Sequence, residues 1–139
     1  MQLINYECCQ EIFYHNDQLY FEYEENNLVL SIDKERPCES CGNVNVTKKF
    51  SNTPLWLIIQ NLITTYQQKK LKVFDLPTEI VIDGVKFRLL MCTYLIASHF
   101  RSIFSINNRF YGYDDMKTEL DSNIIKHVVT SCLYYISKD

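Results

Sequence analysis

Apolar and polar side chains alternate with a period of two along several short segments, and this pattern is typical of β-strands with one buried face. In the first third of the chain the alternation runs through residues 19–24 and 28–32, which are separated by three polar residues that can turn the chain. We therefore predict a β-hairpin over residues 19–32 that projects from the fold as a finger.

The rest of the chain predicts further strands joined by tight turns. An unbroken apolar segment, residues 54–59, is expected to be a strand buried on both faces. Asp83-Gly84 and Asn107-Asn108 are residue types that two-residue hairpin turns prefer. The remaining expectations are strands at 79–82, 85–97, 100–106, 109–113 and 133–136, an exposed loop or short helix at 61–70, and one or two helical turns at 124–129.

Composition strengthens the prediction of a sheet. The chain has ten Tyr, eight Phe and fourteen Ile but a single Ala, Ala97. Aromatic and β-branched side chains suit a pleated surface, and a chain almost without Ala builds helices poorly. Its 139 residues fit one domain, residues 1–139, without an internal repeat or a linker. We expect an α+β fold that is mostly antiparallel β.

Charge and hydropathy bear on the environment and partners of the chain. The net charge is −3 and the isoelectric point is about 5.6, which disfavours nucleic acid because phosphates require a basic surface. No apolar run approaches the roughly 18 residues of a membrane span, and the first residues lack the pattern of a secretory signal. We expect a cytoplasmic or nuclear protein that binds neither nucleic acid nor a membrane.

Six cysteines in a chain without an export signal favour metal ligands, catalytic groups or buried thiols over disulfides. Cys38 and Cys41 form a C-x-x-C-G sequence, whose two thiolates can bind one tetrahedral Zn²⁺. A structural zinc site needs four ligands, and Cys8 and Cys9 precede the predicted hairpin. Adjacent residues of an extended chain point to opposite faces, so a metal that binds both requires a distorted backbone. His15 could replace one of them.

These cysteines define a zinc-finger-like segment, residues 8–41, within the single domain. The alternative is a degenerate zinc knuckle, in which the four thiols only pack against one another. The other two cysteines, Cys92 and Cys132, lie in predicted apolar strands. We interpret both as buried small hydrophobic residues, because free cysteine is among the most buried residue types.

A histidine and an aspartate carry the other candidate chemistry. His99 lies between two predicted strands, where histidine is more often structural than catalytic. The hairpin that turns at Asn107-Asn108 returns the chain toward its start and can place the Asp114 carboxylate against the imidazole of His99. An acid that orients a histidine base is half of a nucleophile–His–Asp triad. We predict that the two groups lie about 2.6–4 Å apart and open onto a groove.

Seven short motifs follow one another along the chain. In order, they are the C-x-x-C sequence at Cys38, the apolar run from Pro54, the Leu76-Pro77 pair, the long predicted strand with Phe87, the His99-Phe100 pair, the segment Phe110–Asp115 and a final aromatic strand from Leu133 to Ile136. This order resembles the C-terminal half of ubiquitin-specific protease catalytic domains. The resemblance implies a papain-like cysteine protease fold, with zinc in its fingers and the catalytic base in its palm.

By position in these motifs, the resemblance implies that His99 is the general base, Asp114 the acid that orients it and Asp115 the second acid. Ser98 and Phe100 replace the Gly and Tyr that flank the family's histidine. This variant is similar to a divergent branch that includes a SUMO-directed isopeptidase. The implied partner is ubiquitin or a ubiquitin-like protein, and the implied cofactor is a structural Zn²⁺.

The family's nucleophile lies in a G-N-T-C-Y-like box far upstream of its histidine, and nothing in this chain matches that box. We therefore expect a partial ubiquitin-specific-protease-like domain that keeps the His/Asp half of the site and is inactive alone, with an N-terminal half missing. One alternative is an inactive module that binds ubiquitin or SUMO as a scaffold. Another is a small thiol hydrolase that uses Cys8 or Cys9 with His99.

Overall fold

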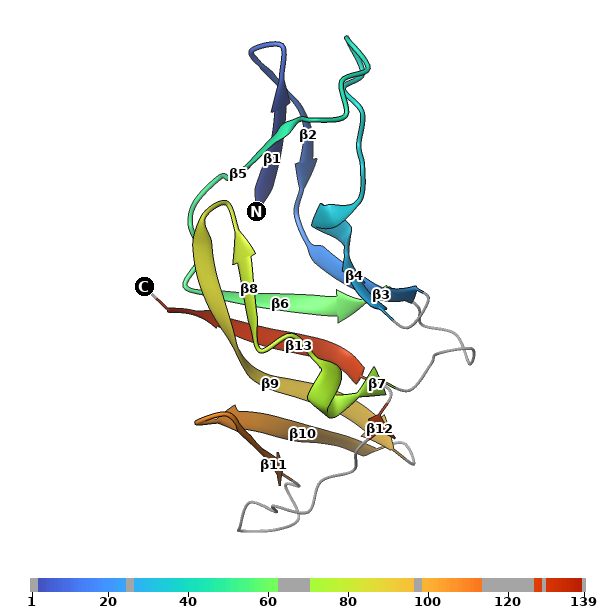
Figure 1. The fold of residues 1–139 in the computed structure, drawn as a ribbon, viewed down its shortest axis with the longest axis vertical. Coiled ribbons are helices and arrows are strands. Elements are labelled where there is room, and N and C mark those ends of the chain that lie inside the picture. Colours follow the sequence, from blue (N-terminus) through green and yellow to red (C-terminus); the bar gives the residue numbers. More distant parts are fainter. Residues whose placement is uncertain are drawn as a thin grey trace.

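The structure is a computed structural model that describes residues 3–24, 27–62, 71–96, 99–113, 127–128 and 130–138. Strands predominate in these ranges, together with the short 3₁₀ turns η1 (Ser31–Asp33) and η2 (Val73–Asp75) (Figure 1). The mostly antiparallel β fold is confirmed. The strands are β1 (Ile4–Cys8), β2 (Glu11–Asn16), β3 (Leu19–Glu24), β4 (Asn27–Leu30), β5 (Thr47–Phe50), β6 (Trp56–Asn61), β7 (Leu71–Lys72), β8 (Glu79–Ile82), β9 (Val85–Ile96), β10 (His99–Ile106), β11 (Arg109–Tyr113), β12 (His127–Val128) and β13 (Thr130–Ser137).

The largest unit, which we call the main sheet, has the strand order β11-β10-β9-β13-β6-β3-β4, and β8 pairs with β9 beside this path. In the described ranges its neighbouring strands are antiparallel, except that β3 and β6 run parallel from the pair Leu19 and Ile59 onward. The short strands β7 and β12 form a separate two-residue ladder. The strands at 79–82, 85–97, 100–106, 109–113 and 133–136 are therefore confirmed within one or a few residues at their ends.

Both predicted tight turns are present. Asp83 and Gly84 have φ values of +50° and +73°, and Asn107 and Asn108 have +49° and +63°. Positive φ at both central residues matches the type I′ turn, whose twist suits the right-handed twist of the flanking strands. The second turn sets the register of β10 and β11, which pair from Ile106 and Arg109 back to Ser102 and Tyr113.

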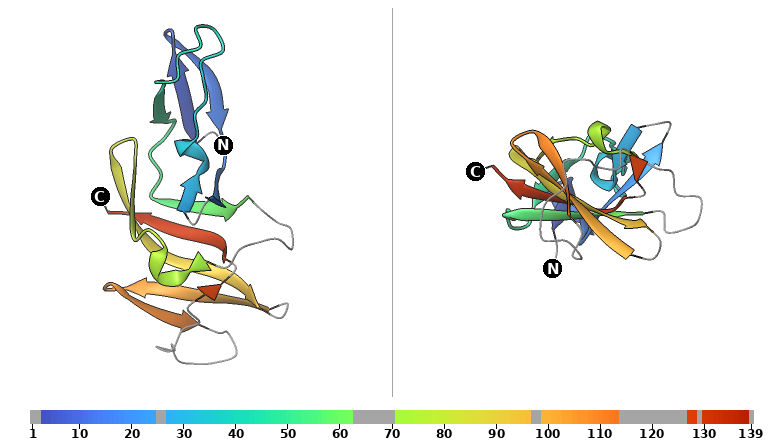
Figure 2. Two further views of the ribbon diagram at one scale, coloured as in Figure 1. Left: turned by 45° about the vertical axis from the view of Figure 1, so that its right-hand side comes forward. Right: turned by 90° about the horizontal axis from the view of Figure 1, so that it is seen from below.

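A second unit, the N-terminal sheet, has the strand order β2-β1-β5 and forms the projecting finger (Figures 1 and 2). The expectation that residues 19–32 form this finger is wrong. Strands β3 and β4 do pair as a hairpin, but β3 also pairs with β6 as part of the main sheet. Leu19 and Phe21 of β3 are only 1% and 2% exposed, so burial of this face is the physical reason that the hairpin does not project.

Strand β6 corrects the expectation of a strand buried on both faces. Leu57 and Ile59 are 2% and 0% exposed and lie in the core. Leu55 and Trp56, however, are 73% and 61% exposed. A continuous apolar run is compatible with burial on both faces, but among the described residues nothing covers the outer side of Leu55 and Trp56.

The N-terminal sheet is fastened to the main sheet by packing and by a hydrogen bond. The backbone N–H of Phe50 in β5 donates to Asp83 Oδ2 in the β8–β9 turn at 2.9 Å. The Phe50 ring packs edge-on against the buried ring of Phe87, with centroids 5.9 Å apart. The buried residues form one hydrophobic cluster that includes Ile4 of β1 and Leu133 of β13. The two sheets therefore share a core.

Two expectations concern connecting segments. Of the loop or short helix expected at 61–70, residues 63–70 lie outside the described residues. Of the helical turns expected at 124–129, only His127 and Val128 are described, and they form strand β12 because they pair with β7. Within the described ranges, no helix is long and apolar enough to cross a membrane.

Candidate metal centre and catalytic half-site

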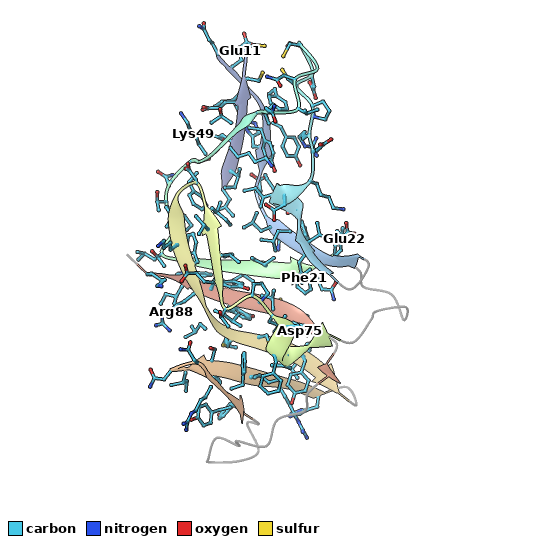
Figure 3. The ribbon with its side chains drawn as sticks, in the orientation of Figure 1. Glu11, Phe21, Glu22, Lys49, Asp75 and Arg88 are labelled. Carbon is cyan, nitrogen blue, oxygen red and sulfur yellow. The ribbon has the colours of Figure 1, made fainter. Side chains whose placement is uncertain are left out.

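Four cysteines gather at the free end of the N-terminal sheet, where yellow sulfur atoms lie close to the labelled Glu11 in Figure 3. We call Cys8, Cys9, Cys38 and Cys41 the cysteine cluster. Its four Sγ atoms all lie within 4.8 Å of one another. Cys38 is buried, Cys8 is half-buried, and Cys9 and Cys41 are exposed. The cluster therefore sits at the surface, with one sulfur facing inward.

The β1–β2 turn explains how two adjacent cysteines reach the same site. Cys8 pairs with Glu11, which leaves Cys9 and Gln10 as a two-residue turn with φ values of +55° and +63°. In an extended strand the two side chains would point to opposite faces. The left-handed conformation of Cys9 removes this alternation, and its Sγ lies 3.7 Å from that of Cys8. The distorted backbone that a shared metal requires is therefore present.

The other two sulfurs come from a tight loop. Cys38 N–H donates to the carbonyl of Asn43 at 2.9 Å, and Gly42 N–H donates to the carbonyl of Cys38 at 2.8 Å. Gly42 has a φ of +72°, and a Cβ added there would meet no atom within 4 Å. The left-handed backbone, and not lack of space, is thus the reason that glycine suits this position. The loop brings Cys41 Sγ to 3.5 Å from Cys8 Sγ.

The spacing of the sulfurs fits a tetrahedral metal. Zinc binds thiolates at about 2.3 Å, which places tetrahedral sulfur ligands about 3.8 Å apart. The Sγ–Sγ separations of 3.7 Å between Cys8 and Cys9 and 3.5 Å between Cys8 and Cys41 are close to this value. The predicted ligands Cys8, Cys9, Cys38 and Cys41 therefore form a set that could hold a metal ion.

The electrostatics differ from one sulfur to the next. Backbone N–H groups of Cys41 and Ser40 donate to Cys38 Sγ and lower the pKa of Cys38 to about 7. Hydrogen bonds with Cys41 and then Cys8 hold the proton on Cys9 and raise its pKa to about 12. The pKa of Cys8 is also raised, chiefly by its hydrogen bond with Cys41. A bound cation favours the thiolate form of every ligand, so metal binding here would release protons.

His15 is not part of this site. It lies in β2, pairs with Asn5 of β1 and is exposed, and it is absent from the group of close ligand atoms. The alternative in which His15 replaces a cysteine is therefore wrong, because the left-handed turn lets both Cys8 and Cys9 contribute. Sequence reasoning missed the β1–β2 hairpin, since neither turn residue is Gly or Asn.

Aromatic and basic side chains support the sheet beneath the cluster. Tyr6 is buried and meets Tyr14 edge-on, with ring centroids 5.2 Å apart. The guanidinium of Arg36 lies 3.5 Å from the centre of the Tyr14 ring, a cation–π contact that ties the loop before Cys38 to β2. Burial is the main reason that the pKa of Tyr6 is raised. These contacts extend the shared core into the finger.

The second candidate site lies in the main sheet. His99 is the first residue of β10, pairs with Ile96 of β9 and is half-buried. The β10–β11 ladder that was predicted to return the chain toward His99 is present. Asp114 and Asp115 directly follow β11 and lie outside the described residues. The facing arrangement of His99 and Asp114 therefore stays a prediction.

The two remaining cysteines differ in burial. Cys92 in β9 is 1% exposed, and burial raises the pKa of its thiol to about 12, which confirms its interpretation as a buried hydrophobic residue. Cys132 in β13 is half-buried, so the expectation of full burial is wrong for it. Its neighbour in the next strand is Thr93, and this face of the sheet is only partly covered.

Comparison with solved structures finds that this fold is similar to part of a deubiquitinating (DUB) module. No protein-family model matches the chain, and no curated protein matches its sequence. A solved chain from the SAGA DUB module Ubp8/Sgf11/Sus1/Sgf73 bound to monoubiquitin matches 99% of this chain, with a TM-score of 0.55 and 11% sequence identity. Two further SAGA DUB module structures, one described as from yeast, match 99% of the chain at a TM-score of 0.48 and 12% identity.

The match covers 40% of each solved chain, so this chain spans about two fifths of the length of those proteins. At 11% identity the likeness concerns the fold alone. The fold of this chain resembles part of a deubiquitinating module that contains the ubiquitin-specific protease Ubp8.

Proposed function

We propose that this chain is the palm-and-fingers portion of a ubiquitin-specific-protease-like domain, and that it binds ubiquitin or a ubiquitin-like protein. The main sheet is the palm and the N-terminal sheet is the fingers. The observation that carries the proposal is that 99% of the chain matches 40% of a solved chain from a DUB module bound to monoubiquitin. The order of the sequence motifs supports the same assignment independently.

The cysteine cluster would hold a structural zinc at the tip of the fingers. Cys8, Cys9, Cys38 and Cys41 supply four sulfur ligands, the donor set typical of closed structural zinc sites. Such a zinc fixes the backbone and takes no part in chemistry. Cys9 and Cys41 are exposed, so the metal would stiffen the surface that the fingers present to a partner.

His99 would act as the general base, with Asp114 orienting its imidazole and Asp115 as the second acid. A histidine base oriented by a carboxylate can take a proton from a thiol, but acyl transfer also needs the thiol itself. No cysteine of the chain is part of a G-N-T-C-Y-like sequence. We therefore propose that a separate segment supplies the nucleophile and that this chain alone cleaves no isopeptide bond.

The geometry speaks against a thiol hydrolase that uses Cys8 or Cys9. Both sulfurs belong to the cysteine cluster at the end of the N-terminal sheet, whereas β10, which begins at His99, lies at the opposite end of the molecule (Figure 1). The raised pKa values of both thiols also disfavour a nucleophilic thiolate. The inactive scaffold that binds ubiquitin or SUMO remains the second candidate, since it requires the same fold and the same partner.

Binding and labelling together test the proposal. The isotope-labelled chain is titrated with monoubiquitin and, separately, with SUMO, and the backbone amide shifts are followed. We expect saturable shifts with one modifier, and no labelling of the chain by a ubiquitin vinyl-sulfone probe. Absence of binding to both modifiers would refute the proposal, and labelling of Cys8 or Cys9 would establish the thiol hydrolase instead.

The half-site has its own test, which also separates it from the scaffold. If Asp114 orients His99, the Asp114→Asn variant changes the balance of the two neutral imidazole tautomers, as measured by long-range ¹⁵N–¹H correlation spectra. Asp17→Asn, an exposed position between β2 and β3 outside the half-site, is the matched control and should leave the tautomers unchanged. Equal spectra for wild type and both variants would show that no oriented base exists and would favour the scaffold.

A further inference from the structure

Within the part of the chain that the structure describes, one edge of β6 is open over its first half. Strand β6 pairs on one side with β13 along its length, from Trp56 and Ile136 onward. On its other side the described pairing with β3 begins only at Ile59. Figure 1 shows the same arrangement, with β3 beside the C-terminal end of β6 alone. Among the described residues, no strand pairs with residues 56–58 on that side.

The backbone groups at this edge point outward. Ser137 N–H donates to the carbonyl of Leu55 at 2.7 Å, so Leu55 belongs to the residues whose backbone groups face β13. Hydrogen-bonded and non-bonded pairs alternate along an antiparallel ladder. The backbone N–H and C=O of Trp56, and the N–H of Ile58, therefore point away from β13 toward the open edge.

A local turn directs the start of β3 away from this edge. If β3 extended by a few residues at its start, it would continue beside residues 56–58. Instead, Gln18 N–H donates to Asn16 Oδ1 at 3.2 Å, and the chain bends at Asp17 and Gln18 toward β2 of the N-terminal sheet. This side-chain turn moves the start of β3 away from β6 and leaves a space between the turn and residues 56–58.

A pocket occupies that space. It has a volume of about 540 Å³ and is lined by Leu3, Asp17, Gln18, Leu19 and residues 54–58. Its walls are mainly apolar, and of the described lining residues only Asp17 is charged. Leu55 and Trp56, two of these lining residues, are 73% and 61% exposed, which is unusual for adjacent large apolar side chains.

Edge strands in soluble proteins are commonly protected by charged side chains, proline or a bulge. Here Pro54 precedes the strand, but residues 55–58 carry no charge and no bulge is recorded in the β6–β13 ladder. An unpaired backbone edge beside an apolar pocket is the arrangement that proteins use to bind an extended peptide as an added strand. The single carboxylate adds a preference for positive charge.

We propose that this edge binds an extended segment of a partner protein, which adds as a strand beside residues 56–58, places one apolar side chain in the pocket and sets a basic side chain near Asp17. Side chains two positions apart lie on the same face of a strand. The recognised pattern is therefore an apolar residue and a basic residue separated by one position.

The site is distinct from the proposed half-site around His99. Trp56 pairs with Ile136 of β13, which pairs in turn with Arg88 of β9. His99, in contrast, pairs with Ile96 of β9. Arg88 and Ile96 are eight residues apart in β9, which corresponds to about 26 Å at roughly 3.3 Å per residue. Failure of the ubiquitin-binding proposal would consequently leave this one standing.

The chain offers a direct reporter, because Trp56 is its single tryptophan. The probe is a blocked heptapeptide of threonine and valine with a central Leu-Thr-Arg. We expect a saturable change in Trp56 fluorescence, together with amide shifts at Trp56 and Ile58. A peptide N-methylated at alternate positions keeps its side chains but loses the N–H donors along one of its two edges. It should bind at least about tenfold more weakly.

The charge preference is tested with Asp17→Asn, because Asp17 is exposed and its replacement should not disturb the fold. This variant should weaken binding of the Leu-Thr-Arg peptide about two- to fivefold, the range of exposed ion pairs, and leave a Leu-Thr-Gln peptide unaffected. Val81→Ser is the matched control, since Val81 is 59% exposed on β8 away from the pocket. It should bind both peptides like the wild type.

Three results would overturn the proposal. The first is no saturable fluorescence change up to about 1 mM peptide. The second is equal binding of the N-methylated and unmodified peptides. The third is a dimer of the free chain, seen by sedimentation velocity, that Ile58→Pro converts to a monomer, since a second copy would then occupy the edge.

Discussion

Removal of metal from the cysteine cluster should disorder the loop that carries Cys38 and Cys41 without unfolding the main sheet. Of residues 38–45, only Cys38 is buried, so the loop gains almost nothing from the hydrophobic core. Its described backbone bonds within this range are those of Cys38 with Asn43 and of Gly42 with Cys38. The loop therefore depends on the cluster for its order.

The magnitude follows from these observations. Fixing the backbone of eight residues costs about 8–16 kcal/mol, whereas the two turn hydrogen bonds and the bond from Asn45 N–H to Asn43 Oδ1 together contribute only about 3 kcal/mol. The difference, about 5–13 kcal/mol, is comparable to the roughly 10–16 kcal/mol that structural zinc supplies in small zinc-binding folds. We therefore expect one zinc per chain and an ordered loop only while it is bound.

The assay combines metal analysis with amide hydrogen exchange. Cys38→Ser combined with Cys41→Ser, or treatment of the wild type with a strong chelator, should remove the zinc and abolish protection at residues 38–45. Protection in β9 and β13 should persist. Cys132→Ser is the matched control, because Cys132 lies in the main sheet outside the cluster. A fully folded preparation without zinc, or a loop that stays protected after its removal, would contradict the reasoning.

Three further outcomes are expected from the main sheet. Phe87→Ala should lower the free energy of unfolding in urea by about 3–5 kcal/mol, because Phe87 is fully buried, whereas Phe100→Ala, 63% exposed, should change it by less than about 0.5 kcal/mol. Tyr135→Phe should cost about 1–3 kcal/mol in the same assay, since the Tyr135 hydroxyl donates to the carbonyl of Pro77 at 2.7 Å. Burial raises the pKa of Cys92 from 9.0 to about 12, so the thiol of the unfolded chain loses its proton at a lower pH than that of the folded chain. The free energy of unfolding should therefore fall between pH 9 and 12. Cys92→Ala should reduce this fall, as measured by urea titrations at several pH values.

Local features of the fold were predictable from the sequence, whereas long-range ones were not. The turns at Asp83-Gly84 and Asn107-Asn108 depend on the left-handed conformations that these residue types tolerate, so the sequence alone locates them. The parallel pairing of β3 with β6 joins segments about forty residues apart and leaves no local signal. A hairpin pattern at residues 19–32 is the same whether the hairpin projects or joins a sheet.

The members of the cysteine cluster were predictable, but their geometry was not. Cysteine identity and the C-x-x-C-G spacing indicate all four residues. The hairpin that presents Cys8 and Cys9 turns at Cys9 and Gln10, residues that seldom adopt positive φ in such turns. A strained turn persists only where the surrounding structure holds it in place. The other three sulfurs of the cysteine cluster surround the Cys9 side chain in this turn.

The apolar run from residue 54 shows a different limit of sequence reasoning. Its pattern matches a strand with two buried faces, yet a strand whose partner surface belongs to another molecule has the same pattern. Leu57 and Ile59 lie in the core, while Leu55 and Trp56 are exposed beside an edge with which no described strand pairs. The core residues account for only half of the run. On our proposal, an extended segment of a partner covers the other half, because the backbone groups of Trp56 point away from β13 as an added strand would need.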